Sequence, residues 1–257
     1  MLKRMLSRKW ILATILVLAA MAVMIRLGIW QLDRLDTRRA FNARVTAQVS
    51  LPSLALEGNA LNADLAEMEY RAASVRGVYD PAGEIALRNQ YYDDQWGVHL
   101  VTPLKISGSE AVILVDRGWI PGDIYQSGDW SAYNEPGTVS VSGVIRLSQS
   151  KAELGRRADP TLAPGHAPLK TWNFVNIPRL SEQLGIDLLP VYIQQSPDPA
   201  WTGLPRRTQV ELDLTEGPHL GYAFQWFIFA TILGFGYPFF IRRQDRDNQQ
   251  SAKDASQ

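Results

Sequence analysis

The chain has 257 residues with 26 basic and 26 acidic side chains, so its formal net charge is zero. This balance gives no electrostatic reason to expect a nucleic-acid partner. The chain has no cysteine, which excludes disulfides, thiolate metal sites, iron–sulfur clusters and thioether-linked haem. Two membrane helices would leave enough residues for one soluble domain of ordinary size.

The first apolar stretch runs from Trp10 to Trp30 and predicts a membrane helix. The alternative is a cleaved signal peptide, with a basic start and Ala20-Met21-Ala22 as the cleavage site. We favour the membrane helix, because the apolar run continues to Trp30 with only Arg26 inside it. The apolar part of a signal peptide is about 7–15 residues long.

The helix is expected to continue beyond the bilayer, because apolar residues recur among charges after Trp30. Trp30 suits the aromatic belt at a membrane surface, and Gln31 and Arg34 can be solvated there. Residues 50–65 contain Pro, Gly and Asn and predict a linker with one short helix.

A pattern of short strands follows, separated by turn residues. The expected strands are Arg71–Tyr79, Glu84–Asn89, Gly97–Ile106, Ala111–Trp119, Thr138–Leu147, Thr171–Ile177 and Leu189–Gln195. Pro178–Gly185 predicts a short helix with Pro at its start and Gly at its end. Lys151–Pro168 is rich in Gly and Pro and is expected to be an exposed, mobile loop. The fold class is therefore α+β, with a mainly antiparallel barrel- or sandwich-like domain.

The second apolar stretch, His219 to Ile241, carries no charged residue after its first position. From Leu220 on it would span about 33 Å as a helix, enough to cross a hydrocarbon core. His219, Tyr222 and Trp226 follow the spacing i, i+3, i+7, so a helix would place them on one face.

Arginines after the second stretch place the C-terminus on the cytoplasmic side, because no Lys or Arg lies between Thr208 and Pro218. Two spans then place the N-terminus there too. The first helix has basic residues on both flanks, so its own sequence leaves its orientation in the membrane ambiguous. The predicted organisation is a cytoplasmic tail (1–9), a membrane helix (10–30), an extracytoplasmic mainly-β domain (31–218), a second membrane helix (219–241) and a cytoplasmic tail (242–257). The lipid bilayer of a cell membrane is thus an expected partner.

The sequence offers no catalytic constellation, so we expect a protein that is not an enzyme. The three histidines, His99, His166 and His219, lie too far apart in sequence for a local metal motif. His99 is expected on an exposed strand face and His166 in a solvated loop. Asp93-Asp94 is expected at the surface, and Asp116-Arg117 is more typical of a structural pair. A sensor is also disfavoured, because the C-terminal tail is too short for an output module.

His219 has two interpretations. It can anchor the helix at the membrane surface, as interfacial Trp and Tyr do, and its spacing alone favours this role. It can also serve as an axial ligand of haem iron, with Tyr222 and Trp226 packing on the porphyrin.

Four segments resemble the Surf1/Shy1 family of cytochrome c oxidase assembly factors. Gly28-Ile29-Trp30-Gln31-Leu32-Asp33-Arg34 resembles its Gly-x-Trp-Gln-x-x-Arg motif, and Gly97–Leu104 resembles its Gly-x-x-x-x-Thr-Pro-Leu strand. Arg117-Gly118-Trp119-Ile120-Pro121 resembles Arg-Gly-Trp-x-Pro. His219-Leu220-Gly221-Tyr222-Ala223-Phe224-Gln225-Trp226-Phe227 resembles His-Leu-x-Tyr-Ala-x-x-Trp-Phe. The four motifs stand in the family's order and cover nearly the whole chain.

The resemblance implies a chaperone role in respiratory-chain biogenesis. Its partners would be oxidase subunit I and other assembly factors, and haem a would be the cofactor it handles. Bacterial relatives are described as haem a binders with the second-helix histidine as candidate ligand, which carries over to His219 only. The family often has Asn before this histidine, where this chain has Pro218. The alternative is a scaffold that binds subunit I without binding haem.

The same resemblance directs attention to Arg117, Gly118 and Trp119. Gly118 suggests a bulge without room for a Cβ, and Trp119 could cap the barrel. Arg117 could reach a haem propionate or a carboxylate inside the domain. Trp30 and Gln31 are expected to pack against the second helix near His219.

Overall fold

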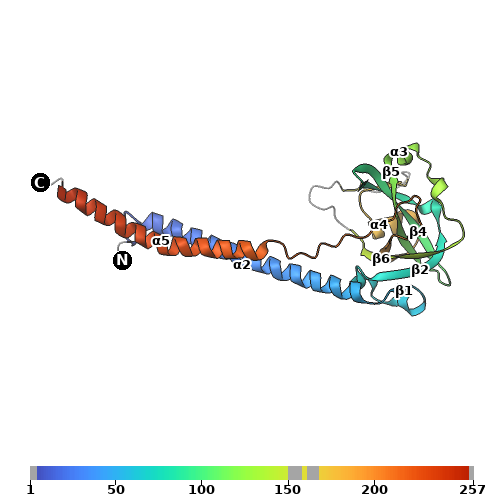
Figure 1. Cartoon of the computed structure of the whole chain (residues 1–257), viewed down its shortest axis with the longest axis horizontal. Coiled ribbons are helices and arrows are strands. Elements are labelled where there is room, and N and C mark those ends of the chain that lie inside the picture. The colour runs from blue at the N-terminus through green and yellow to red at the C-terminus, as the bar shows by residue number, and fades with distance from the viewer. Residues whose placement is uncertain (1–4, 150–157, 161–167, 255–257) are drawn as a thin grey trace. The chain divides into compact units, whose positions relative to one another are not determined.

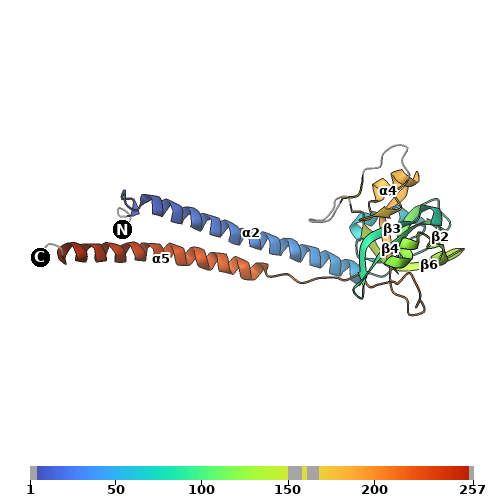
Figure 2. The same cartoon turned by 90° about the horizontal axis from the view of Figure 1, so that it is seen from above.

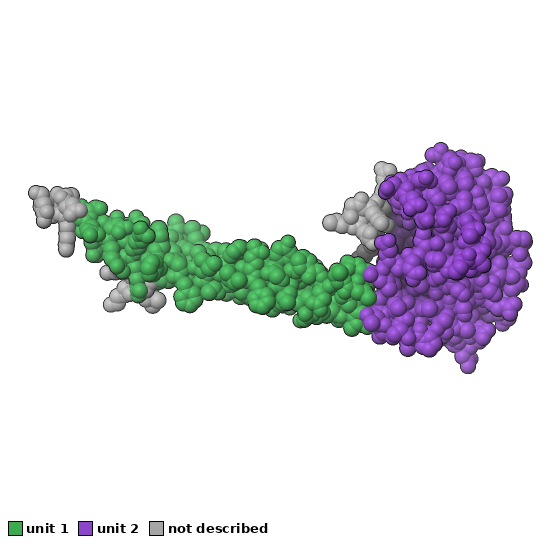
Figure 3. Space-filling model, viewed as in Figure 1, with its two compact units in different colours: residues 1–43, 213–257 green, residues 44–212 purple. Residues whose placement is uncertain are grey.

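The computed structural model describes residues 5–149, 158–160 and 168–254. The chain divides into two compact units, coloured separately in Figure 3. Residues 1–43 and 213–257 form one unit, called here the helical unit. Residues 44–212 form the other, called here the barrel unit.

Two long helices provide the secondary structure of the helical unit. Helix α2 covers Ile11–Ser50 and helix α5 covers His219–Asp254. The prediction that the first helix continues past Trp30 is confirmed, because no proline interrupts it before Pro52. Helix α5 begins at the predicted His219 but runs past Ile241 and includes Pro238.

The two helices lie side by side and antiparallel, as Figures 1 and 2 show. Their contacts follow one another in opposite order along the two sequences. Thr14 Oγ1 lies 2.8 Å from Tyr237 Oη, Met21 lies beside Gly234, and the Phe227 ring lies on Gly28. Three of the buried residues of α5, Ala223, Ala230 and Tyr237, are seven positions apart, and Ile241 follows four positions later. This repeat is typical of helices that wrap around each other with a left-handed twist.

Both helices are long and apolar enough to cross a membrane. Only 11% of the most apolar window of α2 and 17% of that of α5 is buried within the protein. The core helix of a soluble protein would be mostly buried, whereas lipid can cover exposed apolar side chains of this kind. The chain therefore has two candidate membrane-spanning helices that flank a soluble domain.

The barrel unit is mainly antiparallel β structure, which confirms the expected fold class. Its strands are β1 (Leu54–Ala55), β2 (Ala72–Tyr79), β3 (Ile85–Tyr92), β4 (Gln95–Ile106), β5 (Val112–Pro121), β6 (Thr138–Leu147), β7 (Thr171–Trp172) and β8 (Leu188–Gln195). The short helices are η1 (Gly58–Asn62), η2 (Leu65–Met68), η3 (Pro81–Gly83), α3 (Gly122–Ser127), η4 (Ser131–Tyr133) and α4 (Ile177–Leu184).

The sheet closes on itself. Its strand order is β1-β2-β6-β8-β5-β4-β3-β7, and an additional pairing joins β2 to β4. The strands β2, β6, β8, β5 and β4 therefore form a ring, which leaves β1, β3 and β7 as additions to it. Most pairings are antiparallel, but β5 and β8 run parallel. Closure removes free sheet edges from the ring.

Two apolar clusters lie on opposite faces of strands β4 and β5. One fills the ring and includes Leu104, Ile113 and Val115. The other lies outside the ring, where Val101 and Leu114 pack against residues of β7 and α4. The alternation of β4 and β5 thus buries both of their faces.

One predicted strand was wrong over most of its length. Residues 171–177 were expected to be extended, but β7 ends at Trp172 and α4 begins at Ile177. The reason is local: the Asn176 side chain accepts a hydrogen bond from the Arg179 amide at 3.2 Å, which caps the helix start. Gly185 ends α4 in the left-handed region, as predicted.

The predicted linker at residues 50–65 is also more ordered than expected, since it forms β1, η1 and the start of η2. The expected loop at Lys151–Pro168 lies mostly outside the described residues, as does His166.

Candidate functional site

The candidate site in the helical unit is formed by Gln31 and His219. Gln31 Oε1 lies 2.8 Å from His219 Nδ1, although 188 positions separate the two residues. Gln31 lies on α2 and His219 is the first residue of α5, so the contact joins the two helices. The expectation that Gln31 packs near His219 is met.

This contact selects the tautomer of the imidazole ring. An amide oxygen accepts hydrogen bonds and cannot donate them, so Nδ1 carries the proton that is donated to Gln31. In the neutral ring, the second nitrogen, Nε2, then keeps its lone pair. No hydrogen bond to Nε2 is found within the described part of the chain.

The aromatic residues predicted to accompany His219 lie on the same two helices. Tyr222 is 49% exposed, and the half-buried Trp226 meets Phe229 edge-to-face with ring centroids 6.3 Å apart. Trp30 is 42% exposed. The guanidinium of Arg34 lies over the Trp30 ring, 5.6 Å from the ring centroid. Tyr222 and Trp30 thus present exposed rings on the two helices that carry His219 and Gln31.

Pro218 does not prevent the helix from starting at His219. The Pro218 carbonyl accepts a hydrogen bond from the Tyr222 amide at 3.1 Å, which closes the first turn of α5. Gly217, with φ of +68°, adopts a left-handed conformation that suits glycine. The change in chain direction occurs at Gly217, and Pro218 then takes a position that needs no amide donor.

The segment before α5 is held by side chains of α2. Arg39 donates two hydrogen bonds to the Glu216 carboxylate, at 2.8 and 2.9 Å. Arg38 donates to the Asp213 and Thr215 carbonyls, and Asn42 donates to the Leu214 carbonyl at 2.6 Å.

Hydrogen bonds also define the ionisation of this segment. The hydrogen bond from Arg39 and its positive charge hold the pKa of Glu216 below its ordinary value. Hydrogen bonds from Thr215 lower the pKa of Asp213 in the same way, and the charge of Arg38 adds to this. Both carboxylates are therefore ionised at neutral pH and can accept the bonds described above.

Arg117 lies in the barrel unit, where it is 1% exposed. Its guanidinium contacts Glu84 Oε2 at 2.8 Å and Glu135 Oε1 at 2.9 Å. It also donates to the Tyr133 carbonyl, and Thr102 donates to the same oxygen of Glu84. The contacts therefore agree with the internal carboxylate pairing that was considered for Arg117.

Gly118 has the geometry expected of it. The pairing of β4 and β5 shifts between Leu100 and Val101, which places a bulge at Arg117. Gly118 has φ of +115°, and a Cβ there would lie 2.4 Å from the Arg206 carbonyl oxygen. Trp119 is 3% exposed and packs against Tyr92.

The prediction that His99 lies on an exposed face was wrong. Its side chain is 12% exposed, and Nδ1 lies 2.9 and 3.0 Å from the two carboxylate oxygens of Asp116. The outer face of β4 is covered by residues of β7 and α4, a long-range contact that alternation alone does not reveal. Burial lowers the pKa of His99, but the charge of Asp116 and its hydrogen bond together raise it by more. The pKa of His99 therefore lies above its ordinary value.

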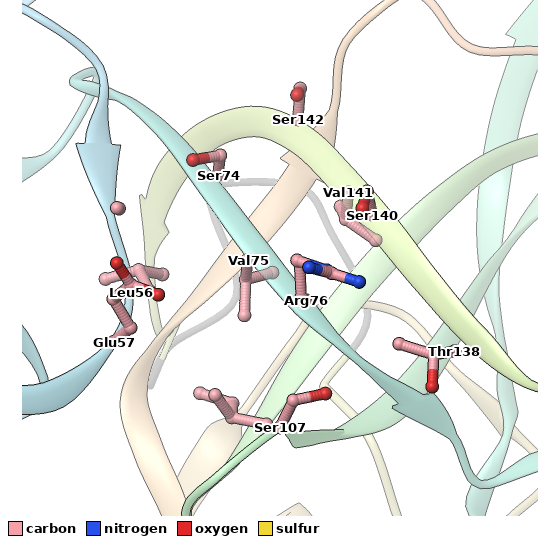
Figure 4. A pocket seen from close by; sticks show the side chains of 12 residues that line it. Leu56, Glu57, Ser74, Val75, Arg76, Ser107, Thr138, Ser140, Val141 and Ser142 are labelled. Atoms are coloured by element: carbon pink, nitrogen blue, oxygen red, sulfur yellow. The ribbon is translucent and has the colours of Figure 1, made fainter.

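An open groove on the barrel contains none of the predicted site residues. It lies along β2 and β6, where Ser74, Ser140 and Ser142 surround Arg76 (Figure 4). Within the described residues there is also no group of three or more His, Asp or Glu side chains that could hold a metal ion. A metal bound at His219 would therefore have to bring its remaining ligands with it, as the iron of haem does.

Comparison with known proteins identifies the family. The model of the SURF1 family matches residues 18–231, which include all four motifs. The chain belongs to the SURF1 family. Membership implies a role in cytochrome oxidase assembly, and the family is one of assembly factors.

Relatives in the SURF1 family span animals and bacteria. A SURF1-like protein of Caenorhabditis briggsae is 22% identical, over 87% of this chain and 74% of its own length. Surfeit locus protein 1 of Mus musculus is 23% identical, over 84% of this chain and 72% of its own. A SURF1-like protein of Rickettsia bellii is 25% identical, over 88% of this chain and 89% of its own.

Several interacting residues were not predicted from the sequence. Glu84 and Glu135 were not identified as partners of Arg117, nor were Arg39 and Glu216 paired with each other. Arg117 is 33 positions from Glu84, and Arg39 is 177 positions from Glu216. Exposed Arg and Glu are common, so only the covariation of such positions among relatives could have indicated these pairs.

Proposed function

We propose that this SURF1-family protein is a membrane-anchored assembly factor that binds haem a through His219 and assists its insertion into subunit I of a haem–copper oxidase. The observation that carries the proposal is the hydrogen bond between Gln31 Oε1 and His219 Nδ1. Histidines that bind metals commonly donate their second ring N–H to such an acceptor, which fixes the tautomer and the direction of the ring.

The residues around His219 suit a flat, largely apolar ligand. Tyr222 and Trp30 present exposed rings, and Trp226 is half-buried. Aromatic and aliphatic surface of this kind favours the face of a porphyrin over a hydrated ion. In this proposal His219 holds the iron, Gln31 orients His219, and the aromatic rings exclude water from the macrocycle. The bound haem supplies only a coordination position on its iron; no reaction of the haem is required.

Transfer requires a ligand that can be released. His219 would be the single iron ligand from this chain, so oxidase subunit I could take over the haem by replacing one side chain. Subunit I is accordingly the proposed partner, together with other oxidase assembly factors. Arg117 is not included among the haem contacts, since its guanidinium is already paired with Glu84 and Glu135.

In the proposed orientation both termini lie in the cytoplasm, and the barrel unit lies on the extracytoplasmic side of the cell membrane. The basic residues after Ile241 support it, because Lys and Arg are retained on the cytoplasmic side. The chain lacks cysteine, so single cysteines at Ser251 and Ser140 can be labelled from outside intact cells without background. Labelling of Ser140→Cys alone is expected. Labelling of Ser251→Cys alone would contradict the orientation.

The test of haem binding is the absorption spectrum of protein purified in detergent from cells that make haem a. The wild type should carry haem a, and His219→Ala should lose it. His219→Gln is the matched control, because an amide can still hydrogen-bond to Gln31 but does not serve as the haem ligand. Loss in both variants assigns ligation to the imidazole, whereas unchanged haem in His219→Ala would refute the proposal.

A scaffold that binds subunit I without haem is the alternative, and the same strains distinguish it. If His219→Ala supports normal oxidase assembly and the purified wild type never takes up haem, the scaffold is correct. Loss of assembled, haem-containing oxidase in His219→Ala and His219→Gln, with normal levels of both variant proteins, supports haem handling.

A further inference from the structure

The three residues Arg38, Arg39 and Asn42 form one group on α2, and each contacts the segment that leads into α5. We define the connecting segment as Asp213–Pro218, which lies with α2 and α5 in the helical unit. Arg38 and Asn42 are four positions apart, so they lie on the same side of the helix. Every contact described below is within this unit.

The main-chain contacts fix the path of the connecting segment. The Asn42 amide donates to the Leu214 carbonyl, and Arg38 donates to the Thr215 carbonyl at 2.9 Å and to the Asp213 carbonyl. Three successive carbonyl groups are therefore bound by α2. Bonds to backbone carbonyls depend on chain position and not on side-chain identity, so they set which residues of the two segments lie together.

A side-chain pair adds specificity at the end of the segment. Arg39 and Glu216 meet through two parallel hydrogen bonds, which is the most directional arrangement available to an ion pair. The Asp213 carboxylate makes contacts both with α2 and within the connecting segment. It contacts Arg38 at 3.1 Å and accepts hydrogen bonds from the amide and the hydroxyl of Thr215.

The distances along the two chains explain why these contacts matter for His219. Gln31 and Arg39 are eight residues apart on α2, about 12 Å at 1.5 Å per residue. Glu216 and His219 are three residues apart, so the chain between them can span at most about 11 Å. These two lengths are nearly equal, so moving His219 a further helical turn past Gln31, about 5.4 Å, would exceed the reach of the main chain while Arg39 holds Glu216.

We infer that Arg38, Arg39 and Asn42 are positioning residues, which clamp the connecting segment and so set the register in which His219 meets Gln31. This inference deepens the proposed function and rests on it for the value of the register to haem binding. The register itself can be measured without haem. Removing the clamp frees the first turns of α5 to shift relative to α2, because only the Gln31–His219 hydrogen bond and apolar contacts remain there, whereas the Thr14–Tyr237 contact still holds the other end.

The test measures disulfide formation between Gln31→Cys and His219→Cys in membranes, with copper phenanthroline as the oxidant. The chain has no native cysteine, so each product is unambiguous. The reference pair is Thr14→Cys with Tyr237→Cys, at the other end of the helical contact. The clamp is then broken by Arg39→Glu or by Glu216→Arg, and it is restored in reversed polarity by both changes together.

We expect each single charge change to slow crosslinking of the 31/219 pair about fivefold, since it replaces an attraction between two exposed charges with a repulsion. The double change should restore the rate to within about twofold, and the 14/237 pair should be unaffected throughout. Lys105→Glu is the matched control, because it breaks another exposed ion pair, Lys105–Glu110 of the barrel, which has a distance of 2.9 Å against 2.8 Å for Arg39–Glu216. It should leave both rates unchanged.

Three outcomes would overturn the inference. They are an unchanged 31/219 rate in both single variants, no recovery in the double variant, and no crosslinking of the 31/219 pair in the parent. The proposed function fails separately. If the crosslinking behaves as expected but protein with native Gln31 and His219 never binds haem a, the clamp stands and haem handling is refuted.

Discussion

Gly28 of α2 lies directly against the ring of Phe227 on α5. A Cβ on Gly28 would stand 2.7 Å from two carbons of that ring, closer than side-chain carbons approach in folded proteins. Gly28 is buried, and Gln31 lies one turn further along the same helix. The missing side chain at Gly28 thus allows the helices to approach closely beside the site, as small residues do in membrane helix pairs.

Gly28→Leu should therefore separate the helices and weaken the Gln31–His219 contact. Overfilling a packed contact costs about 1–3 kcal/mol, so the thermal midpoint in detergent should fall. Gly221→Ala is the control, because nothing lies within 4 Å of a Cβ at that position of α5. The idea is refuted if Gly28→Leu is as stable as Gly221→Ala and retains the 31/219 crosslink.

The acceptor on Gln31 leads to a second prediction. Gln31→Leu has a similar volume but cannot accept the Nδ1 proton, so the imidazole loses its orientation. Loss of such a partner typically reduces metal affinity about 10–100-fold. Haem a titration of the purified variant should show this weakening, while His219→Ala shows no specific binding. Equal affinity in Gln31→Leu and wild type would mean that Gln31 has no role in ligation.

Local features of the fold could be predicted from the sequence because their causes lie within a few residues. The short helix α4 follows from Pro178 and Gly185, and the β4–β5 hairpin follows from the Ser107–Ser109 turn, where Gly108 has φ of +76°. The two candidate membrane helices follow from apolar runs. His219 was identified by its position at the start of the second run, Gln31 was found through resemblance, and their hydrogen bond was expected only as proximity.

Features that depend on distant segments could not be predicted in this way. The parallel pairing of β5 with β8 needs the ring to close, and the burial of His99 needs α4 to cover β4. The pairing of Arg39 with Glu216 needs α5 to return along α2 in one register. In each case the residues carry no local signal, because their partners are supplied by the tertiary arrangement.

The buried charge cluster around Arg117 gives a third prediction, on stability. Arg117→Met would leave the Glu84 carboxylate buried without its cation, and breaking a buried pair costs about 3–5 kcal/mol. The midpoint of denaturant unfolding should fall accordingly. Lys105→Gln, which breaks an exposed pair, should change the free energy of unfolding by less than about 1 kcal/mol.

A double variant separates the charge from the shape of the Arg117 site. Arg117→Met with Glu84→Gln removes the cation and its main counter-charge together, so it should be more stable than Arg117→Met alone. If the single variant unfolds at the wild-type midpoint, the cluster contributes nothing to stability. If the double variant is no better than the single, packing outweighs electrostatics at this position.

The buried pair of His99 and Asp116 gives a fourth prediction, on pH. Because the folded state raises the pKa of His99 above its ordinary value of about 6.5, the folded protein binds this proton more tightly than the unfolded chain does. The resulting stabilisation is fully present below about pH 6.5 and is lost as the pH rises through the folded-state pKa.

Unfolding midpoints of wild type and His99→Gln, measured between about pH 5.5 and 9, should therefore differ most at the acidic end and converge towards the alkaline end. Asp116→Asn removes the charge that raises the pKa of His99, so the same dependence should disappear in that variant. A gap between wild type and His99→Gln that widens as the pH rises would mean that the buried imidazole is neutral in the folded protein.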